Sequence, residues 1–270
     1  MKISPIKQFG QHFLIEDSIA DAIIEAAQIT EDDQVWEIGP GKGILTERII
    51  KKTGNLTAFE IDNRLTVYLL NRFPGIILIN RDVLQVDWKE YFDKQYSNKK
   101  IKLLSNLPYQ ITSPVLYKLE EFAENFSCIT LMLQKEVADR LSAVPGKKAY
   151  GVLTLRMQYS FKIKQLFNVS PSAFLPQPQV QSAVIQLLPR KDKPVVNSLD
   201  TFRQIVNKAF LSRRKTLKNN LRSFLPNETV NSLALQSNID FNRRGETLEE
   251  KDFINLADCL DSINNKNRGK

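Results

Sequence analysis

The sequence is poor in cysteine and histidine and has no long apolar run. Its 270 residues include two cysteines, Cys128 and Cys259, and a single histidine, His12. Two distant cysteines do not make a disulfide framework, and one histidine excludes a multi-histidine metal site. No stretch approaches the roughly 18 apolar residues of a membrane span, and the first residues lack the apolar core of a secretory signal. We therefore expect a cytoplasmic protein with free thiols and no metal.

Acidic side chains are the scarcer charge. Lysine and arginine total 38 against 30 for aspartate and glutamate, which leaves a net charge of +8. A basic balance of this size favours a polyanionic partner, because lysine and arginine neutralise phosphates and release counterions. Charge alone leaves open a basic protein without any nucleic-acid role, so the decision depends on where the charges cluster.

Short apolar runs alternate with amphipathic stretches from Gln34 to Gln134. This alternation predicts βαβ units, in which helices cover both faces of a parallel sheet. The expected strands are Gln34–Ile38, Leu56–Ile61, Ile76–Asn80, Ile101–Ser105, Ile129–Gln134, Ile163–Val169 and Ser182–Leu188. The expected helices are Ser18–Ala27, Ile44–Lys52, Asn63–Asn71, Ser113–Glu121, Lys135–Ser142 and Tyr150–Phe161. After a proline-containing linker the chain is expected to be helical, which predicts two domains, 1–190 and 191–270.

A glycine-rich turn follows the first expected strand, in the segment Glu37-Ile38-Gly39-Pro40-Gly41-Lys42-Gly43-Ile44. Glycines are needed where the backbone turns sharply and approaches a ligand closely. A dinucleotide site would have a small residue where Ile44 or Thr46 stands, and a Walker A loop would have Ser or Thr where Gly43 stands. Neither alternative fits, and Gly39 and Gly41 are expected to bind a different nucleotide-like cofactor.

Two acids follow the next expected strands. Glu60 lies about 20 residues after Gly39, the interval at which an acid binds ribose hydroxyls in folds of this type. Asp82 lies just beyond the third strand, where its carboxylate can accept a hydrogen bond from an adenine amino group. Each acid alone could equally be a helix cap or a solvated loop charge. Together they predict an adenosine pocket at the carboxyl edge of the sheet.

The tetrapeptide Asn106-Leu107-Pro108-Tyr109 follows the fourth expected strand at that same edge. The N6 nitrogen of adenine is a poor nucleophile because its lone pair is conjugated into the ring. The Asn106 oxygen and a backbone carbonyl of Leu107-Pro108 can accept both N6 hydrogens, which favours a pyramidal nitrogen aimed at a sulfonium methyl. Tyr109 offers a ring for an extruded base, and Phe174, on a proline-rich loop, is the candidate for the opposite wall. A capped helix-entry turn and an ordinary buried Phe174 are the alternatives.

Together these residues resemble one family, the KsgA-type small-subunit rRNA adenine dimethyltransferases. The matching segments are Lys7–Leu14, Glu37–Gly43, Glu60, Asp82, Asn106–Pro114, Phe174–Ser182 and Arg213–Leu217. The resemblance implies an α/β fold, with a Rossmann-like class I methyltransferase domain on a mostly parallel seven-stranded sheet and a small all-helical C-terminal domain. It also implies S-adenosyl-L-methionine as cofactor, dimethylation of two adjacent adenines in the 3′-terminal hairpin loop of 16S rRNA, and a role in small-subunit maturation.

The resemblance assigns roles to individual residues as well. Those that would contact the cofactor are His12, Leu14, Gly39, Gly41, Glu60, Asp82 and Asn106, and those that would hold the target base are Asn106, Leu107, Pro108, Tyr109 and Phe174. His12 stands where the family often has asparagine, so a backbone contact is expected there. Large-subunit relatives that confer macrolide resistance usually carry isoleucine in place of Leu107 and differ over Gln110–Leu116. The sequence therefore favours the small-subunit group.

A basic segment without any acid extends from Thr201 to Asn227. Its seven cationic side chains are Arg203, Lys208, Arg213, Arg214, Lys215, Lys218 and Arg222. Apolar residues recur in it at helical spacing, so we expect a helix that packs on one face and binds rRNA phosphates through Arg213, Arg214, Lys215, Lys218 and Arg222. A solvated helix face is the alternative.

At the level of function, we expect a monomeric methyltransferase. Two alternatives remain: an assembly factor that acts mainly by binding, and a DNA adenine methyltransferase.

Overall fold

The computed structural model describes residues 3–6, 9–96 and 99–268. The chain forms two compact units, Met1–Ala138 with Phe161–Pro189 and Asp139–Ser160 with Arg190–Lys270. The second unit therefore includes residues 139–160 in addition to the C-terminal stretch. No helix in the described part of the chain combines the length and apolar character that a membrane crossing requires.

The first unit is built on a seven-stranded sheet with the strand order β4-β3-β2-β5-β6-β9-β7. Neighbours from β4 to β6 pair in parallel, whereas β9 is antiparallel to both β6 and β7. The strands are β2 (Gln34–Ile38), β3 (Leu56–Phe59), β4 (Ile77–Ile79), β5 (Ile101–Asn106), β6 (Phe126–Gln134), β7 (Phe161–Val169) and β9 (Ser182–Pro189). This confirms the expected mostly parallel α/β sheet.

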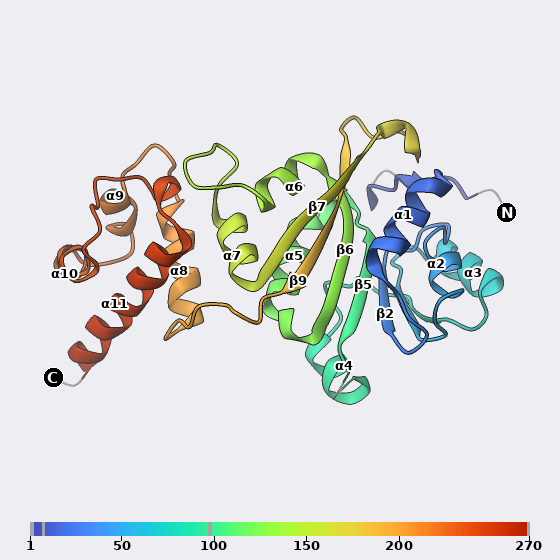
Figure 1. The fold of residues 1–270 in the computed structure, drawn as a ribbon, viewed down its shortest axis with the longest axis horizontal. Coiled ribbons are helices and arrows are strands. Elements are labelled where there is room, and N and C mark those ends of the chain that lie inside the picture. The colour runs from blue at the N-terminus through green and yellow to red at the C-terminus, as the bar shows by residue number, and fades with distance from the viewer. Residues whose placement is uncertain (1–2, 7–8, 97–98, 269–270) are drawn as a thin grey trace. The chain divides into compact units, whose positions relative to one another are not determined.

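Helices cover both faces of this sheet, as parallel strands require. In Figure 1, α1 (Asp17–Ala27), α2 (Thr46–Ile49) and α3 (Asn63–Arg72) lie on one side, and α5 (Thr112–Glu121) and α6 (Lys135–Leu141) lie on the other. Short 3-10 helices are η2 (Tyr109–Ile111), η3 (Ala123–Asn125) and η4 (Pro171–Ala173). The central strands are apolar on both sides because both sides are buried.

Two elements of the first unit were not expected from the sequence. One is α4 (Trp88–Gln95), whose Trp88 and Phe92 rings pack 5.5 Å and 5.0 Å from the buried Trp36 ring. The other is a two-stranded antiparallel sheet formed by β1 (Phe13–Leu14) and β8 (Phe174–Leu175). This small sheet joins the N-terminal segment to the proline-rich loop, and its alternation decides which side chains of the loop are buried.

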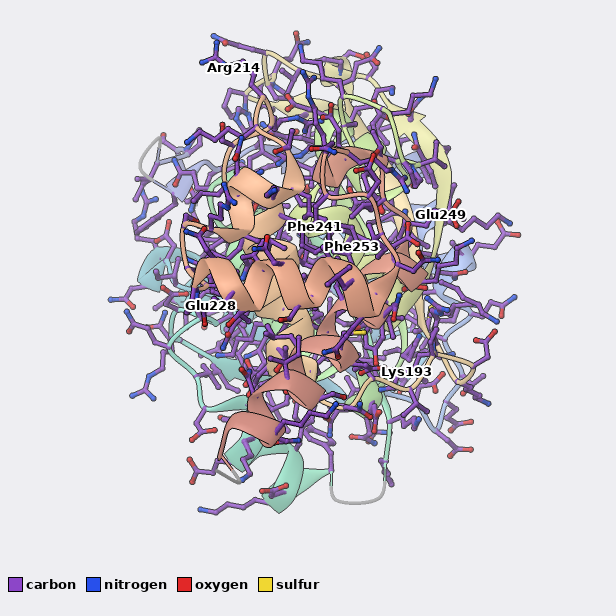
Figure 2. The ribbon with its side chains drawn as sticks, turned by 90° about the vertical axis from the view of Figure 1, so that its left-hand side faces the viewer. Lys193, Arg214, Glu228, Phe241, Glu249 and Phe253 are labelled. Carbon is purple, nitrogen blue, oxygen red and sulfur yellow. The ribbon has the colours of Figure 1, made fainter. Side chains whose placement is uncertain are left out.

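The second unit is helical, as expected. Its helices are α7 (Val152–Ser160), α8 (Leu199–Ala209), α9 (Leu217–Leu221), α10 (Asn227–Ser237) and α11 (Glu250–Arg268), with the 3-10 helix η5 (Gly245–Thr247). Phe202, Phe241 and Phe253 belong to its buried core. Figure 2 shows Phe241 and Phe253 in the middle of the ribbon, whereas Arg214 extends away from it.

The basic segment is not a single helix, which corrects the expectation. It is divided between α8, which ends at Ala209, and α9, which begins at Leu217. The buried side chain of Asn220 donates to the carbonyls of Ala209, at 2.8 Å, and Ser212, at 3.0 Å, and its oxygen accepts from the Ser212 amide at 3.2 Å. Thr216 then caps α9 by accepting from the Asn219 amide. These hydrogen bonds stabilise a loop between the helices, because they satisfy backbone groups that a continuous helix would have paired.

Candidate active site

A cavity opens at the carboxyl ends of β2, β3 and β5. Its walls come from residues 9–14, most of 37–45, 59–61, 81–83 and 106–111. We call it the strand-end cavity. It is lined by every residue expected to contact the cofactor, namely His12, Leu14, Gly39, Gly41, Glu60, Asp82 and Asn106. Leu107, Pro108 and Tyr109 line it as well.

The glycine turn has backbone conformations that side chains rarely adopt. The φ angles of Gly39, Gly41 and Gly43 are +66°, +59° and +82°. A Cβ at Gly41 would lie 3.1 Å from the Phe13 ring, so the turn is also crowded. The amide of Gly41 donates to Glu60 Oε2 at 3.3 Å. Glycine is needed here for both its conformation and its small size.

Glu60 is buried, with 5% of its surface exposed, and its carboxylate is held by backbone amides. Oε1 accepts from the Asp62 amide at 2.9 Å, and Oε2 accepts from the Gly41 amide. Burial raises the pKa of Glu60, while the two amide hydrogen bonds act in the opposite direction. A carboxylate has about four acceptor positions, so Glu60 retains capacity for two ribose hydroxyls.

Glu37 is a second buried acid of the cavity, although its position within a strand does not by itself mark it as a site residue in the sequence. Only 1% of it is exposed, and Oε2 accepts from the Thr46 hydroxyl at 2.7 Å. Burial, reinforced by the charge of Glu60, raises the pKa of Glu37 to about 8. The signal in the sequence was an acid within the apolar strand Gln34–Ile38, because a buried strand carries a carboxyl group only at a cost.

Asp82 lies in a turn that follows β4. Its Oδ1 accepts from the Leu84 amide at 2.9 Å, and its main-chain carbonyl accepts from the Gln85 amide at 2.9 Å. The side chain is half-buried in the cavity wall. One carboxylate oxygen is thus fixed by the turn, and the carboxylate keeps acceptor capacity for a ligand.

Asn106 ends β5, and its amide group is oriented by the N-terminal segment. Nδ2 donates to the His12 carbonyl at 3.1 Å, so Oδ1 is the acceptor that remains. The Leu107 amide donates to the Met132 carbonyl at 3.0 Å, which holds the turn against β6. The Pro108 carbonyl accepts from the Ile111 amide at 3.1 Å and the Thr112 hydroxyl at 3.3 Å.

Tyr109 presents its ring beside His12. The two ring centroids are 5.7 Å apart, with an interplanar angle of 29°. The Tyr109 hydroxyl and the Ser182 hydroxyl lie 2.7 Å apart and share a hydrogen bond. Burial raises the pKa of Tyr109, so the phenol stays neutral at physiological pH. The ring is therefore fixed at both its edge and its face.

The N-terminal segment contributes more than the sequence predicted. His12 Nδ1 lies 2.8 Å from the Pro176 carbonyl, and Gln11 Nε2 donates to Asp62 Oδ2 at 3.0 Å. Lys42 Nζ lies 4.8 Å from the centroid of the Phe13 ring. Gln11 and Phe13 are site residues that spacing alone could not identify, because their partners are distant in the chain. The first two residues of the matching segment, Lys7 and Gln8, lie outside the described residues.

Phe174 is not placed in the cavity wall, which differs from the expectation. Its side chain is 1% exposed and belongs to a buried apolar cluster with Leu14 and Val184. The neighbouring Leu175 is 58% exposed. Successive side chains of a strand point to opposite faces, so the β1–β8 pairing turns Phe174 inward and Leu175 outward.

The cationic residues of the basic segment have different surroundings. Arg213 Nη2 forms a 2.6 Å ion pair with Glu246, and Nη1 donates to the Tyr150 carbonyl at 3.1 Å. Arg214, Lys215 and Arg222 are exposed, and Lys218 is half-buried. Among the described residues, neither Arg214 nor Lys215 has an ion-pair partner. In that same part of the chain, no group of three or more histidine, cysteine or acidic side chains is arranged to hold a metal ion.

Similar proteins agree on one family. A family model described as ribosomal RNA adenine dimethylase matches residues 5–262. A protein of Bacillus licheniformis named ribosomal RNA small subunit methyltransferase A is 42% identical over 95% of this chain and 91% of its own length. A protein of the same name from Alkaliphilus oremlandii is 40% identical over 94% of this chain and 91% of its own length.

Solved structures show the same fold. A dimethyladenosine transferase from Plasmodium falciparum superimposes with a TM-score of 0.78 at 26% identity, over 95% of this chain and 98% of that chain. The 23S rRNA methyltransferase ErmE superimposes with a TM-score of 0.65 at 24% identity, over 92% and 99%, and shares the fold. The chain therefore belongs to the ribosomal RNA adenine dimethylase family, a family of S-adenosylmethionine-dependent enzymes.

Proposed function

We propose that this protein, as a cytoplasmic monomer, dimethylates N6 of two adjacent adenines in the 3′-terminal hairpin loop of 16S rRNA during small-subunit maturation. The observation that carries the proposal is the placement of Asn106 and Tyr109 in the same cavity as Gly41, Glu60 and Asp82. The small-subunit substrate is supported by the names of the relatives that are 40–42% identical.

The strand-end cavity fits S-adenosylmethionine in three respects. A side chain at Gly41 would be strained and would crowd the Phe13 ring, Glu60 offers acceptor positions for ribose hydroxyls, and Asp82 offers one for an adenine amino group. When bound, the cofactor supplies an electrophilic sulfonium methyl group. His12, Leu14, Gly39 and Asn106 complete the proposed cofactor contacts, with His12 acting through its backbone.

Catalysis then depends on how Asn106 and its neighbours hold the target base. The Pro108 carbonyl is engaged by Ile111 and Thr112, so the Leu107 carbonyl is the better candidate to accept the second N6 hydrogen beside Asn106 Oδ1. Accepting both hydrogens favours a pyramidal nitrogen with a directed lone pair. The Tyr109 ring supports the extruded base by stacking. Orientation and electrostatics therefore supply the rate enhancement, and the proton leaves to water.

Binding of the rRNA is assigned to the basic segment of the second unit. Arg214, Lys215, Lys218 and Arg222 would contact phosphates, and Arg213 would contribute less because Glu246 already compensates its charge. Phosphate contacts of this kind position the RNA without reading its sequence. Selection of the two adenines therefore belongs to the strand-end cavity and its rim.

The proposal is tested by incubating the protein with labelled cofactor and three substrates in parallel: precursor small subunits, large subunits and duplex DNA. Label in the two adjacent adenines of 16S rRNA is expected, located by primer extension, which stops at dimethyladenine. Label in the large subunit or in DNA alone would refute the small-subunit assignment. Tight binding to precursor subunits without any label would instead support the assembly-factor alternative.

A further inference from the structure

Lys118 lies on α5, the helix that begins directly after the Asn106–Ile111 turn, and its ammonium group is surrounded by main-chain carbonyls. Nζ donates to the carbonyls of Val83, Leu84 and Val86 at 3.4, 3.1 and 2.6 Å. All three carbonyls belong to the short loop that connects β4 to α4. One cation therefore holds three backbone carbonyls of a single loop.

Trp88, the first residue of α4, closes the other side of this arrangement. Its ring lies 5.0 Å below Lys118 Nζ, and its Nε1 donates to the Val83 carbonyl at 3.1 Å. Val83, Val86 and Trp88 are each at most 4% exposed. Carbonyl dipoles that converge in a poorly hydrated place repel one another unless a cation lies between them. The conformation of this loop therefore depends on the charge of Lys118.

The same loop carries Asp82 and Val83 into the wall of the strand-end cavity. The Leu84 amide donates to Asp82 Oδ1, so the carboxylate is fixed to the residue whose carbonyl Lys118 holds. Burial lowers the pKa of Lys118, and the charges of Glu121, Asp87 and Asp82 oppose that shift. Asp82 is thus linked to Lys118 through the backbone of Leu84.

We infer that Lys118 is a positioning residue for the adenine end of the cofactor: it fixes the loop that presents Asp82 to the adenine amino group. Lys118 itself does not line the cavity. The inference rests on the proposed function, because it takes Asp82 as the acceptor for that amino group. It adds a second role to α5, whose first turn follows the residues proposed to hold the target base.

The test compares two ligands that differ at the adenine amino group. S-adenosylhomocysteine carries the amino group, whereas its purine-riboside analogue carries a hydrogen in its place and keeps N1 as an acceptor. Calorimetry on the full chain is expected to show a preference for the adenosyl ligand of about tenfold or more, the effect of one hydrogen bond to a charged acceptor. Lys118→Met is expected to lower this preference towards unity, while Lys118→Arg retains most of it.

A role in stability alone would weaken both ligands equally and leave the preference unchanged, and that result would overturn the inference. Lys118→Gln serves if Lys118→Met does not fold, because its amide donates hydrogen bonds without the charge, and the preference should again fall. Lys89→Met is the matched control, since Lys89 is an exposed lysine of α4, and its preference should equal that of the unmodified protein.

Asp82→Asn separates this inference from the proposed function. An asparagine can keep the hydrogen bond from the Leu84 amide but loses the charged acceptor. If Asp82→Asn keeps the full preference, the proposed adenine contact is wrong. If Asp82→Asn loses the preference and Lys118→Met keeps it, the adenine contact stands and the role of Lys118 is wrong.

Discussion

In the strand-end cavity of the first unit, the acids Glu37 and Glu60 are buried and have fixed partners, the Thr46 hydroxyl for Glu37 and the amides of Gly41 and Asp62 for Glu60. In the basic segment of the second unit, most cationic groups are exposed, and Arg213 is paired with an acid. A single substitution among buried groups with fixed partners should have a large effect, because the loss of one group leaves its partners unsatisfied. Exposed cations should contribute to the affinity for a polyanion additively, because each one can neutralise a phosphate independently.

The largest effect is expected at the reacting turn of the cavity. Asn106→Ala removes an acceptor for an N6 hydrogen and should lower the methylation rate at least about a hundredfold, as loss of one oriented group at a reacting centre does. Affinity for precursor small subunits should change little. Single-turnover methylation and filter binding measure the two quantities. Asn71→Ala, at an exposed position of α3, is the control, and full methylation by Asn106→Ala would contradict the assignment.

Glu37 tests whether burial keeps an acid of the cavity protonated near neutral pH. Its pKa in the folded protein is about 8, above the ordinary value of 4.5, so between these pH values the folded state keeps a proton that the unfolded state has released. Stability should therefore be full below pH 4.5 and fall as pH rises towards 8, with a slope on the order of 1.4 kcal/mol per pH unit.

Glu37→Gln should remove this contribution and flatten the curve. Urea unfolding of both proteins from pH 5 to pH 8 provides the comparison. Glu60 also has a raised pKa, so only the difference between the two curves reports on Glu37. Curves that stay parallel would mean that Glu37 is ionised in the folded protein.

A smaller effect is expected for the ribose contact. Glu60→Gln keeps the shape of the side chain but removes its charge, and it should weaken S-adenosylhomocysteine binding about tenfold. Calorimetry measures the change, and Glu47→Gln on the exposed side of α2 serves as the control because Glu47 does not line the strand-end cavity. Equal affinities for Glu60→Gln and the unmodified protein would place the ribose elsewhere.

The smallest single effects are expected in the basic segment. Arg214→Ala and Lys215→Ala should each reduce the slope of log affinity against log salt concentration by about 1. Arg213→Ala should change the slope less, because Glu246 already neutralises much of the Arg213 charge in the folded protein. Titrations of rRNA binding at several salt concentrations test this. Equal changes in slope for Arg213→Ala and Arg214→Ala would mean that the ion pair with Glu246 does not reduce the contribution of Arg213 to RNA binding.

The sequence placed together those residues of the candidate site whose position depends on local spacing. Gly39, Glu60, Asp82 and Asn106 each lie at or just after the end of a strand, and parallel strands bring their carboxyl ends to one edge. The sheet and most of its helices were predicted for the same reason, since apolar runs report burial directly. The observed ends of some elements differ from the predicted ends by a few residues, as in α2, because hydrogen bonding rather than composition decides where a helix begins and ends.

The features that the sequence missed depend on distant partners. Phe174 is buried because β8 pairs with β1, and those strands are separated by most of the first unit's chain. Arg213 is paired with Glu246, 33 residues further along, which no charge count within the segment reveals. The basic segment is broken because Asn220 holds the backbone of Ala209 and Ser212. Gln11 and Phe13 become site residues only once the N-terminal segment covers the cavity.

The position of Lys118 on α5 has a consequence for how the enzyme tolerates change in length. Thr112 follows the turn that would hold the target adenine, and Lys118 holds the loop proposed to bind the cofactor's adenine. Lys118 is six positions after Thr112 in the helix, which corresponds to a rise of about 9 Å. Inserting one residue between them would lengthen this separation by about 1.5 Å and turn Lys118 by about 100° around the helix axis relative to Thr112. Surface loops can lengthen freely, but the proposed roles of Asn106 and Lys118 would require this stretch of α5 to keep its length, because it would set the spacing between the two proposed nucleobase sites.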